Sequence, residues 1–63
     1  MNVEKIKQKM KIKGFSLYKL SLESEISYST LHDLIITKKA KNPRIDTLVK
    51  IAESLEEKVE NLI

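Results

Sequence analysis

The chain has 63 residues, with 12 basic and 9 acidic side chains, one histidine and no cysteine. This length predicts a single small domain over residues 1–63, and the lack of cysteine excludes a disulfide framework and a thiolate-based zinc site. Glycine and proline occur once each and strand-like alternation is absent, so we expect an all-α fold stabilised by helix packing alone. A single histidine and the lack of convergent catalytic groups argue against a metal, a cofactor or an enzyme.

Charge is distributed unevenly along the chain. Eleven basic and five acidic side chains up to Lys50 give +6, whereas one basic and four acidic side chains after it give −3. A basic body with an acidic end suits a polyanion-binding face, although an ordinary lysine-rich surface would have the same charge. No signal sequence or transmembrane stretch is recognisable, and we expect a cytoplasmic protein.

A first helix is predicted over residues 2–12. Three apolar residues recur there at the three- and four-residue spacing of one helical face: Val3, Ile6 and Met10. Gly14 is expected to end this helix in a left-handed conformation. Phe15 follows, and we predict it to be the central aromatic residue of the core.

A helix-turn-helix is predicted over residues 16–36. Ser16 can cap a helix over residues 17–24 and Ser27 a second helix over residues 28–36, because a serine hydroxyl accepts a hydrogen bond from a backbone N–H of the first turn. The polar break between the two helices is short, and such a pair turns one face of the second helix toward a partner. We expect this partner to be DNA.

The second of these helices has two different faces. At about 100° per residue, one face is largely apolar and consists of Thr30, Leu31, Leu34 and Ile35. The other face combines groups that can read base edges, namely Tyr28, Ser29, His32 and Asp33. His32 could equally be an idle surface residue, and Asp33 a solvated charge that rejects wrong sequences. Ile36 also falls on the polar side, and we expect it to fold back onto the core.

A basic loop is predicted over residues 37–44, where Pro43 breaks the helix. Four cations of this loop are placed to contact phosphates: Lys38, Lys39, Lys41 and Arg44. A fourth helix is predicted over residues 45–55, and a final turn over residues 59–63. The apolar residues of that turn either close the core or form a dimer interface, and we expect a mixture of the two: Val59, Leu62 and Ile63. A homodimer would present two such helices about 34 Å apart to a palindromic operator.

A pattern of spaced core, cap and breaker residues extends over nearly the whole chain. It consists of Gly14-Phe15-Ser16, Leu20-Ser21, Ile26-Ser27, Leu31-x-x-Leu34, Asn42-Pro43 and Thr47-Leu48-x-x-Ile51-Ala52-x-x-Leu55. This pattern resembles the phage-repressor and Cro-like (lambda repressor-like, XRE-type) helix-turn-helix domains. The resemblance implies a compact five-helix domain, usually dimeric, that binds palindromic operators as a transcriptional regulator. It also implies base-reading or groove-facing positions for Tyr28, Ser29, His32 and Asp33.

The chain departs from that family at several positions. Leu17 stands where many members carry a glutamine that contacts phosphate, so we expect Lys19 or Lys9 to replace that contact. Other residues occupy three glycine positions of the family, where a left-handed backbone would cost about 1 kcal/mol each: Glu25, Thr37 and Glu56. Met10 and Ile35 replace an Arg–Glu pair that many members bury, which leaves no lone buried charge.

The leading hypothesis is a sequence-specific, double-stranded DNA-binding transcriptional regulator, a repressor without enzymatic activity. The helix of residues 28–36 would enter the major groove, and the basic loop would hold phosphates together with the helix N-termini at Ser16 and Ser27. The alternative is a protein-interaction module, antitoxin-like or anti-repressor, on the same fold. Four side chains favour that alternative: Leu17, Tyr28, Asp33 and Ile36.

Overall fold

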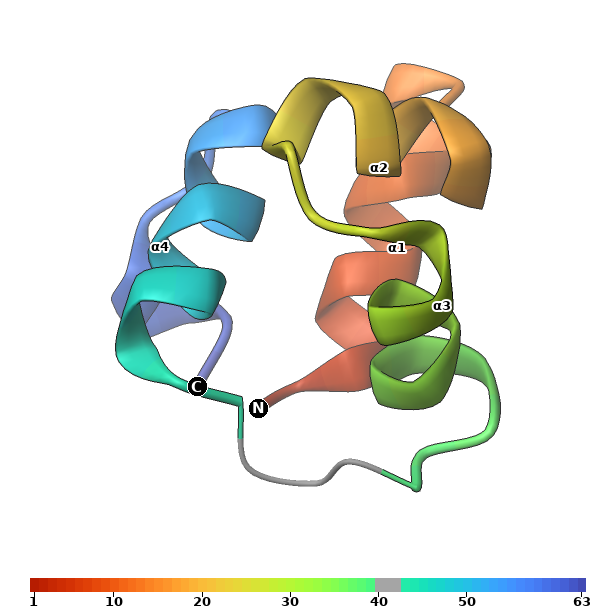
Figure 1. Cartoon of the computed structure of the whole chain (residues 1–63). Helices are drawn as coiled ribbons and strands as arrows, with labels where there is room; N and C mark the ends of the chain where they lie inside the picture. Colours follow the sequence, from red (N-terminus) through yellow and green to blue (C-terminus); the bar gives the residue numbers. More distant parts are fainter. Residues whose placement is uncertain (40–42) are drawn as a thin grey trace.

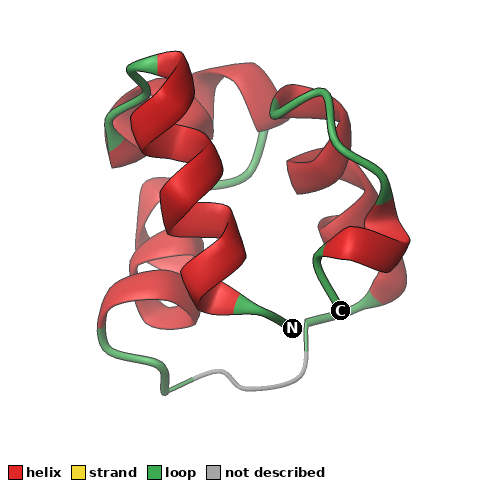
Figure 2. Cartoon of the chain, turned by 180° about the vertical axis from the view of Figure 1, so that it is seen from behind, coloured by secondary structure: helices red, strands yellow, loops and turns green. Residues whose placement is uncertain are grey.

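The computed structural model describes residues 1–39 and 43–63, and within these ranges every regular element is helical (Figures 1 and 2). In chain order the elements are α1 (Val3–Lys13), α2 (Leu17–Ser24), α3 (Tyr28–Leu31), the π-helical turn η1 (His32–Ile36), α4 (Ile45–Ser54) and the 3-10 turn η2 (Val59–Asn61). The predicted all-α class is confirmed. The five-helix count is not confirmed, because the last predicted helix is a single 3-10 turn. None of the helices in the described ranges has the length and apolar character needed to span a membrane.

Side chains determine where the first three helices begin. Asn2, Ser16 and Ser27 each accept a hydrogen bond, through a side-chain oxygen, from the backbone N–H three residues on, at 3.1, 3.0 and 3.3 Å. Each cap satisfies an N–H that has no partner within the helix and stabilises the fold by about 1 kcal/mol. The predicted serine caps are therefore confirmed. The left-handed Gly14, with φ 71°, is confirmed as the end of α1.

The core between the helices is aliphatic. The buried apolar residues are Ile6, Met10, Leu20, Leu31, Leu34, Ile35, Leu48, Ile51, Ala52, Leu55 and Leu62. Phe15 is not at its centre, contrary to the prediction, but packs partly buried against its edge. The reason is local: the Phe15 N–H donates to the Met10 carbonyl at 2.8 Å, in a Schellman-type helix end that holds Phe15 in the connection between α1 and α2.

Ser24 is the one buried polar residue of the described ranges. Its hydroxyl donates to the Leu20 carbonyl at 2.7 Å, so the polar group is satisfied within α2 itself. A small side chain at this position lets the end of α2 approach α4, and the two helices lie side by side in Figure 1.

The helix predicted over residues 28–36 changes its winding after one turn. It continues as η1, in which the Thr37 N–H donates to the His32 carbonyl, five residues back, at 3.0 Å. Two side chains differ from the prediction. Ile36 is 51% exposed instead of folding back, because Leu34 and Ile35 already occupy the core side of the wide turn. Thr30 is exposed because its hydroxyl is held in the cap, where it accepts from Ser27 Oγ at 2.7 Å.

Three residues other than glycine have a left-handed backbone: Glu25, Lys38 and Glu56, with φ of 59°, 60° and 54°. At Glu25 and Glu56, two of the family's three glycine positions, the chain thus keeps the left-handed conformation despite its cost. At the third position the turn differs, because Thr37 has φ −82°. The π-helical turn explains the difference, because Thr37 still closes the widened turn and the chain reverses one residue later, at Lys38.

The C-terminal segment packs back on the start of the chain. The Asn2 N–H donates to the Leu62 carbonyl at 2.6 Å, and Leu62 is fully buried. Leu62 therefore closes the core, which is the first of the two alternatives for this segment. Val59 packs partly buried against the core, whereas Ile63 is 71% exposed.

Candidate nucleic-acid interface

The side chains predicted to read bases lie together on the outer side of α3 and η1. We call Tyr28, Ser29, His32 and Asp33 the reading surface. None of the four is buried, and Tyr28 is 48% exposed. The Tyr28 ring stacks on the His32 imidazole, so α3 and η1 present one continuous aromatic surface. An outward aromatic and polar surface of this kind is accessible to a partner as large as a duplex.

Hydroxyl groups surround this aromatic pair. Ser27 Oγ donates a hydrogen bond to Thr30 Oγ1 and lies 3.5 Å from Ser29 Oγ. Thr37 Oγ1 donates to Asp33 Oδ1 at 3.4 Å. Thr30 therefore joins the exposed hydroxyls beside the reading surface, although the sequence pattern placed it on the core face. The signal that could have revealed this is its position three residues after a serine N-cap, where a threonine hydroxyl can join the cap.

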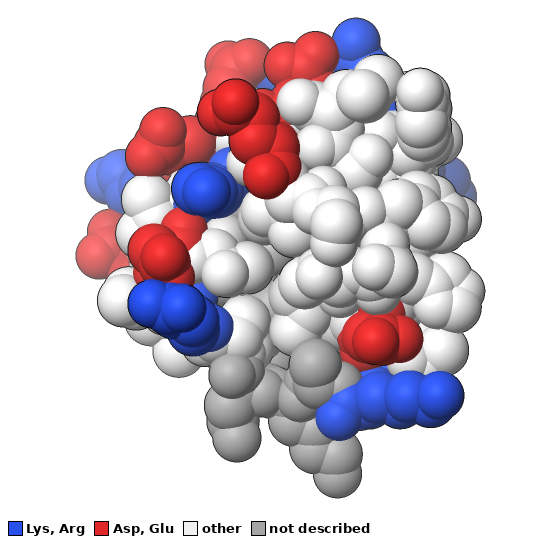
Figure 3. All heavy atoms as spheres, viewed as in Figure 1, with Lys and Arg blue, Asp and Glu red and all other residues white. Residues whose placement is uncertain are grey.

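Residues 28–36 contain no lysine or arginine. In Figure 3 the surface over α3 is almost free of charged side chains, with one acidic group and a basic group at its lower edge. The reading surface thus offers hydrogen bonds, an aromatic ring and one carboxylate. Attraction to phosphates must come from the residues around it.

Lysines lie directly beside the reading surface. Lys38 and Lys39 follow η1 and are exposed, and neither forms an ion pair with another residue of the described ranges. Arg44 is exposed before α4, and its Nε lies 3.7 Å from Asp46 Oδ1, an exposed pair of little strength. Lys41, the other predicted phosphate contact of this loop, lies outside the described residues.

The other predicted phosphate-binding lysines already have carboxylate partners. Lys19 Nζ lies 3.1 Å from Glu23 Oε1 on the same helix, and Lys9 Nζ lies 3.7 Å from Glu57 Oε2 in the C-terminal segment. The structure therefore brings Lys38 and Lys39 next to the reading surface but directs Lys9 toward the acidic end of the chain. A phosphate at Lys9 or Lys19 would share the ammonium group with the carboxylate or compete with it.

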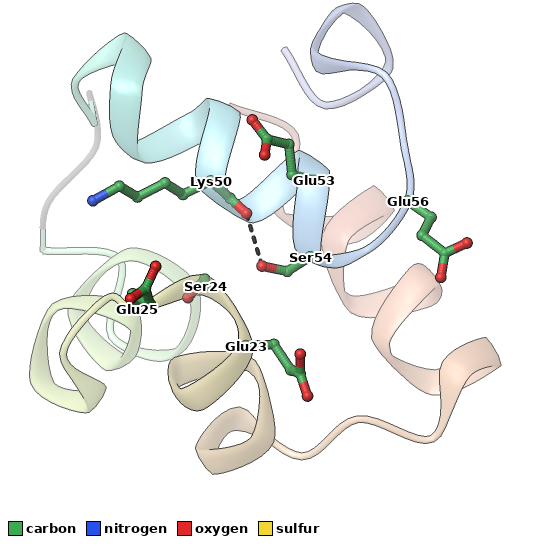
Figure 4. A pocket seen from close by; sticks show the side chains of 7 residues that line it. All are labelled: Glu23, Ser24, Glu25, Lys50, Glu53, Ser54 and Glu56. Atoms are coloured by element: carbon green, nitrogen blue, oxygen red, sulfur yellow. Dashed lines mark hydrogen bonds between the residues drawn. The ribbon is translucent and has the colours of Figure 1, made fainter.

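Acidic side chains gather between α2 and α4, around a cleft of about 370 Å³; Figure 4 shows the side chains that line it. Its lining consists of Glu23, Ser24, Glu25, Lys50, Glu53, Ser54 and Glu56. Glu23 and Glu56 are paired with Lys19 and Lys13, whereas Glu25 and Glu53 have no ion-pair partner within the described residues, so the cleft keeps a weak negative charge that disfavours a polyanion. The Ser54 hydroxyl donates to the Lys50 carbonyl at 2.8 Å, so it adds no free donor to the cleft.

A protein-family model described as the Cro/C1-type HTH DNA-binding domain matches residues 5–63. The chain belongs to this family. Comparisons with curated proteins and with solved structures gave no match. Membership supports a DNA-binding regulator and implies double-stranded DNA as its partner. The predicted resemblance is thereby confirmed.

The departures of this Cro/C1-type domain from the phage-repressor pattern have structural consequences. Leu17 is half-buried at the start of α2 and offers no hydrogen bond to a phosphate. Met10 and Ile35, 9% and 1% exposed, are both in the apolar core. The domain thus holds α1 against η1 by apolar packing and without a buried ion pair. This replacement should not lower the stability of the fold, because a buried ion pair stabilises little more than apolar packing does.

Proposed function

We propose that this Cro/C1-type domain is a repressor that recognises one operator sequence with α3 and η1. The observation that carries the proposal is the outward Tyr28–His32 stack, which lies beside two lysines that have no ion-pair partner within the described residues. Repression by occupying a promoter needs no activity besides tight and selective DNA binding.

Each member of the reading surface has a chemistry that suits a base edge. The Ser29 hydroxyl and an imidazole N–H of His32 can donate to the acceptors of purines. The Asp33 carboxylate can accept from a cytosine amino group, and the Tyr28 ring can pack against a thymine methyl group. A surface without arginine lacks the usual bidentate contact to guanine, so we expect an operator with few guanine contacts.

Phosphate contacts would come from the rim of the reading surface. Lys38 and Lys39 follow η1 and Arg44 precedes α4, and Lys41 of the same loop is proposed as a further contact. The N-termini of α2 and α3, after the caps Ser16 and Ser27, add backbone N–H groups that point out of the helix ends. Lys9 and Lys19 could contribute alongside their carboxylate partners or in place of them.

Dimerisation would let one complex read two half-sites. We propose that exposed Ile63, with the half-buried Val59 beside it, contributes to a two-fold interface. Buried Leu62 would support that surface from within the core. In a two-fold dimer the two reading helices would enter successive major grooves on one side of a palindrome, about 34 Å apart.

In vitro selection from random duplex DNA tests the proposal. We expect enrichment of a palindromic consensus with half-site centres about 10 base pairs apart. Failure to enrich any duplex sequence at low salt would contradict sequence-specific binding. A consensus with a single half-site would contradict only the dimer, and sedimentation equilibrium of the complex would check that result.

A further inference from the structure

An apolar groove of about 410 Å³ lies between α1, the start of α2 and η1. Its apolar lining comes from Met10, Phe15, Leu17, Ile35 and Ile36. The groove contains no residue of the reading surface and none of the basic loop. It borders the surface proposed to bind DNA, at Leu17 and Ile36, but it does not include the base-reading side chains or the lysines of the loop.

The groove is open because three of its side chains are displaced from the core. The π-helical turn leaves Ile36 51% exposed, and Phe15 and Leu17 remain only partly buried at the joint of α1 and α2. Exposed apolar area of this kind costs free energy in water, at about 25 cal/mol per Å². Covering it would be favourable for any partner with an apolar surface of matching shape.

The charges at the rim of the groove select among such partners. Lys7 and Lys11, one helical turn apart on α1, line it, and no carboxylate does. Neither lysine forms an ion pair within residues 1–39 and 43–63. The lysines on the opposite flank of α1 differ, since Lys9 and Lys13 pair with Glu57 and Glu56 at 3.7 and 2.8 Å. Two lysines of the opposite flank are thus paired within the chain, whereas both lysines along the groove have no carboxylate partner in the described residues.

We infer that this groove binds a protein segment of an acidic amphipathic kind, an apolar helix face with carboxylates on its flank. Carboxylates one helical turn apart on such a segment match the spacing of Lys7 and Lys11, because residues four apart on a helix are neighbours. A duplex does not fit, because the groove floor offers apolar groups where phosphates and sugars would lie. A small ligand fits poorly. Protein pockets usually bury about 70–90% of the surface of such a ligand, whereas this groove is open on the side of half-exposed Ile36.

A designed peptide provides the probe for this inference. It is a fluorescein-labelled helical peptide with leucine at three- and four-residue spacing and glutamate on the flanking positions. Two matched peptides carry lysine in place of glutamate, or serine in place of leucine. We expect saturable binding of the acidic peptide only, by fluorescence anisotropy, with amide shift changes in NMR spectra confined to the residues around Leu17 and Ile36.

Two variants of the protein locate the site. Lys7→Glu with Lys11→Glu is expected to weaken peptide binding at least tenfold, and Ile36→Ser at least fivefold. Lys50→Glu with Lys58→Glu, which changes the charge equally on other surfaces, is expected to change it less than twofold. All five substituted residues are exposed, so circular dichroism and the melting temperature should show an intact fold.

Several outcomes would overturn the inference. These are a lack of saturable binding, an equal loss in the two lysine pairs, or shift changes away from the groove. Groove variants that alter sedimentation of the free protein would assign the groove to a second copy of this chain. Groove variants that weaken DNA binding, with no peptide bound, would assign it to DNA. A failure of the proposed DNA recognition would be distinguishable from a failure of this inference. Variants of the reading surface that lose DNA selectivity should still bind the peptide, since the groove shares no residue with the reading surface.

Discussion

The Tyr28 ring and the His32 imidazole stack with their centroids 6.1 Å apart and their planes at 30°. Tyr28 begins α3 and His32 begins η1, so the stack joins the two halves of the reading helix across the point where its winding changes. π-Helical turns often occur at functional sites. The Tyr28–His32 stack gives the π-helical turn η1 a defined outer surface.

Removing the tyrosine ring is expected to change which DNA sequence is bound. Tyr28→Ala should alter the consensus obtained by selection, with discrimination at the affected base pair reduced by about 1–3 kcal/mol. Lys39→Ala should weaken binding to all sequences alike and leave the consensus unchanged, because a phosphate contact carries no sequence information. A changed consensus for the lysine variant and an unchanged one for the tyrosine variant would contradict this division of roles.

The salt dependence of DNA binding should identify the phosphate contacts. Each neutralised phosphate contributes about 0.9 to the slope of log K against log salt. Lys38→Ala is therefore expected to reduce the magnitude of that slope by about 1, when dissociation constants are measured over a series of potassium chloride concentrations. Lys58→Ala, an exposed lysine of the C-terminal segment, is the matched control and should leave the slope unchanged.

The left-handed backbone at Glu25, with φ 59°, is expected to limit stability. Glu25→Gly should raise the free energy of unfolding by about 0.5–1 kcal/mol, because glycine adopts this conformation without steric cost. For a domain of this size the melting temperature should rise by about 2–8 °C. Glu25→Gln removes the same charge from the acidic cleft but keeps the strain. An equal gain from Glu25→Gln would attribute the effect to charge repulsion instead.

Acid should destabilise the contact between α1 and the C-terminal segment. A hydrogen bond and the attraction of the Lys13 ammonium lower the pKa of Glu56 below its usual 4.5, and hydrogen bonds from the Asn61 amide and the Lys58 N–H lower the pKa of Glu57. Because the folded pKa values lie below the unfolded ones, this stabilisation is complete above about pH 4.5 and is lost as the pH falls through the folded values.

Urea denaturation between about pH 3 and 6 provides the measurement. Glu56→Gln and Glu57→Gln should each flatten the acid limb of the stability curve. Glu60→Gln, a loss of one charge on the same segment, is the comparison variant. An acid limb of the same steepness in all three variants would contradict a role for the Lys13–Glu56 contact.

Much of the fold follows from local signals in the sequence. The bounds of α2, Leu17–Ser24, agree with the prediction, because a serine cap and the spacing of apolar residues act within a few residues. The same holds for the left-handed Gly14 and for the burial of Met10 and Ile35. The outward position of Tyr28, Ser29, His32 and Asp33 was predictable too, since all four lie on the outer side of one short helix; their role in reading bases stays a prediction.

The features that were not predicted depend on contacts between distant residues or on backbone winding. A spacing of 100° per residue assumes an α-helix, so it gave no sign of the π-helical turn that exposes Ile36 and moves the left-handed residue to Lys38. The pairing of Lys9 with Glu57 joins the two ends of the chain and has no local signature. Ser24 is buried because its hydroxyl bonds within α2, a choice of rotamer that composition does not reveal.

The separation of charge on this small domain has a consequence for the way it meets DNA. Carboxylates gather between α2 and α4, and in Figure 3 acidic groups lie along the upper and left parts of the face, with some basic groups among them, while a basic side chain extends from the lower edge. Such a molecule carries an electric dipole, and the field of a duplex exerts a torque on it before contact. Before contact, the field of the duplex would thus turn the basic side of the domain toward DNA. A larger fraction of diffusional encounters would then begin in an orientation that allows binding.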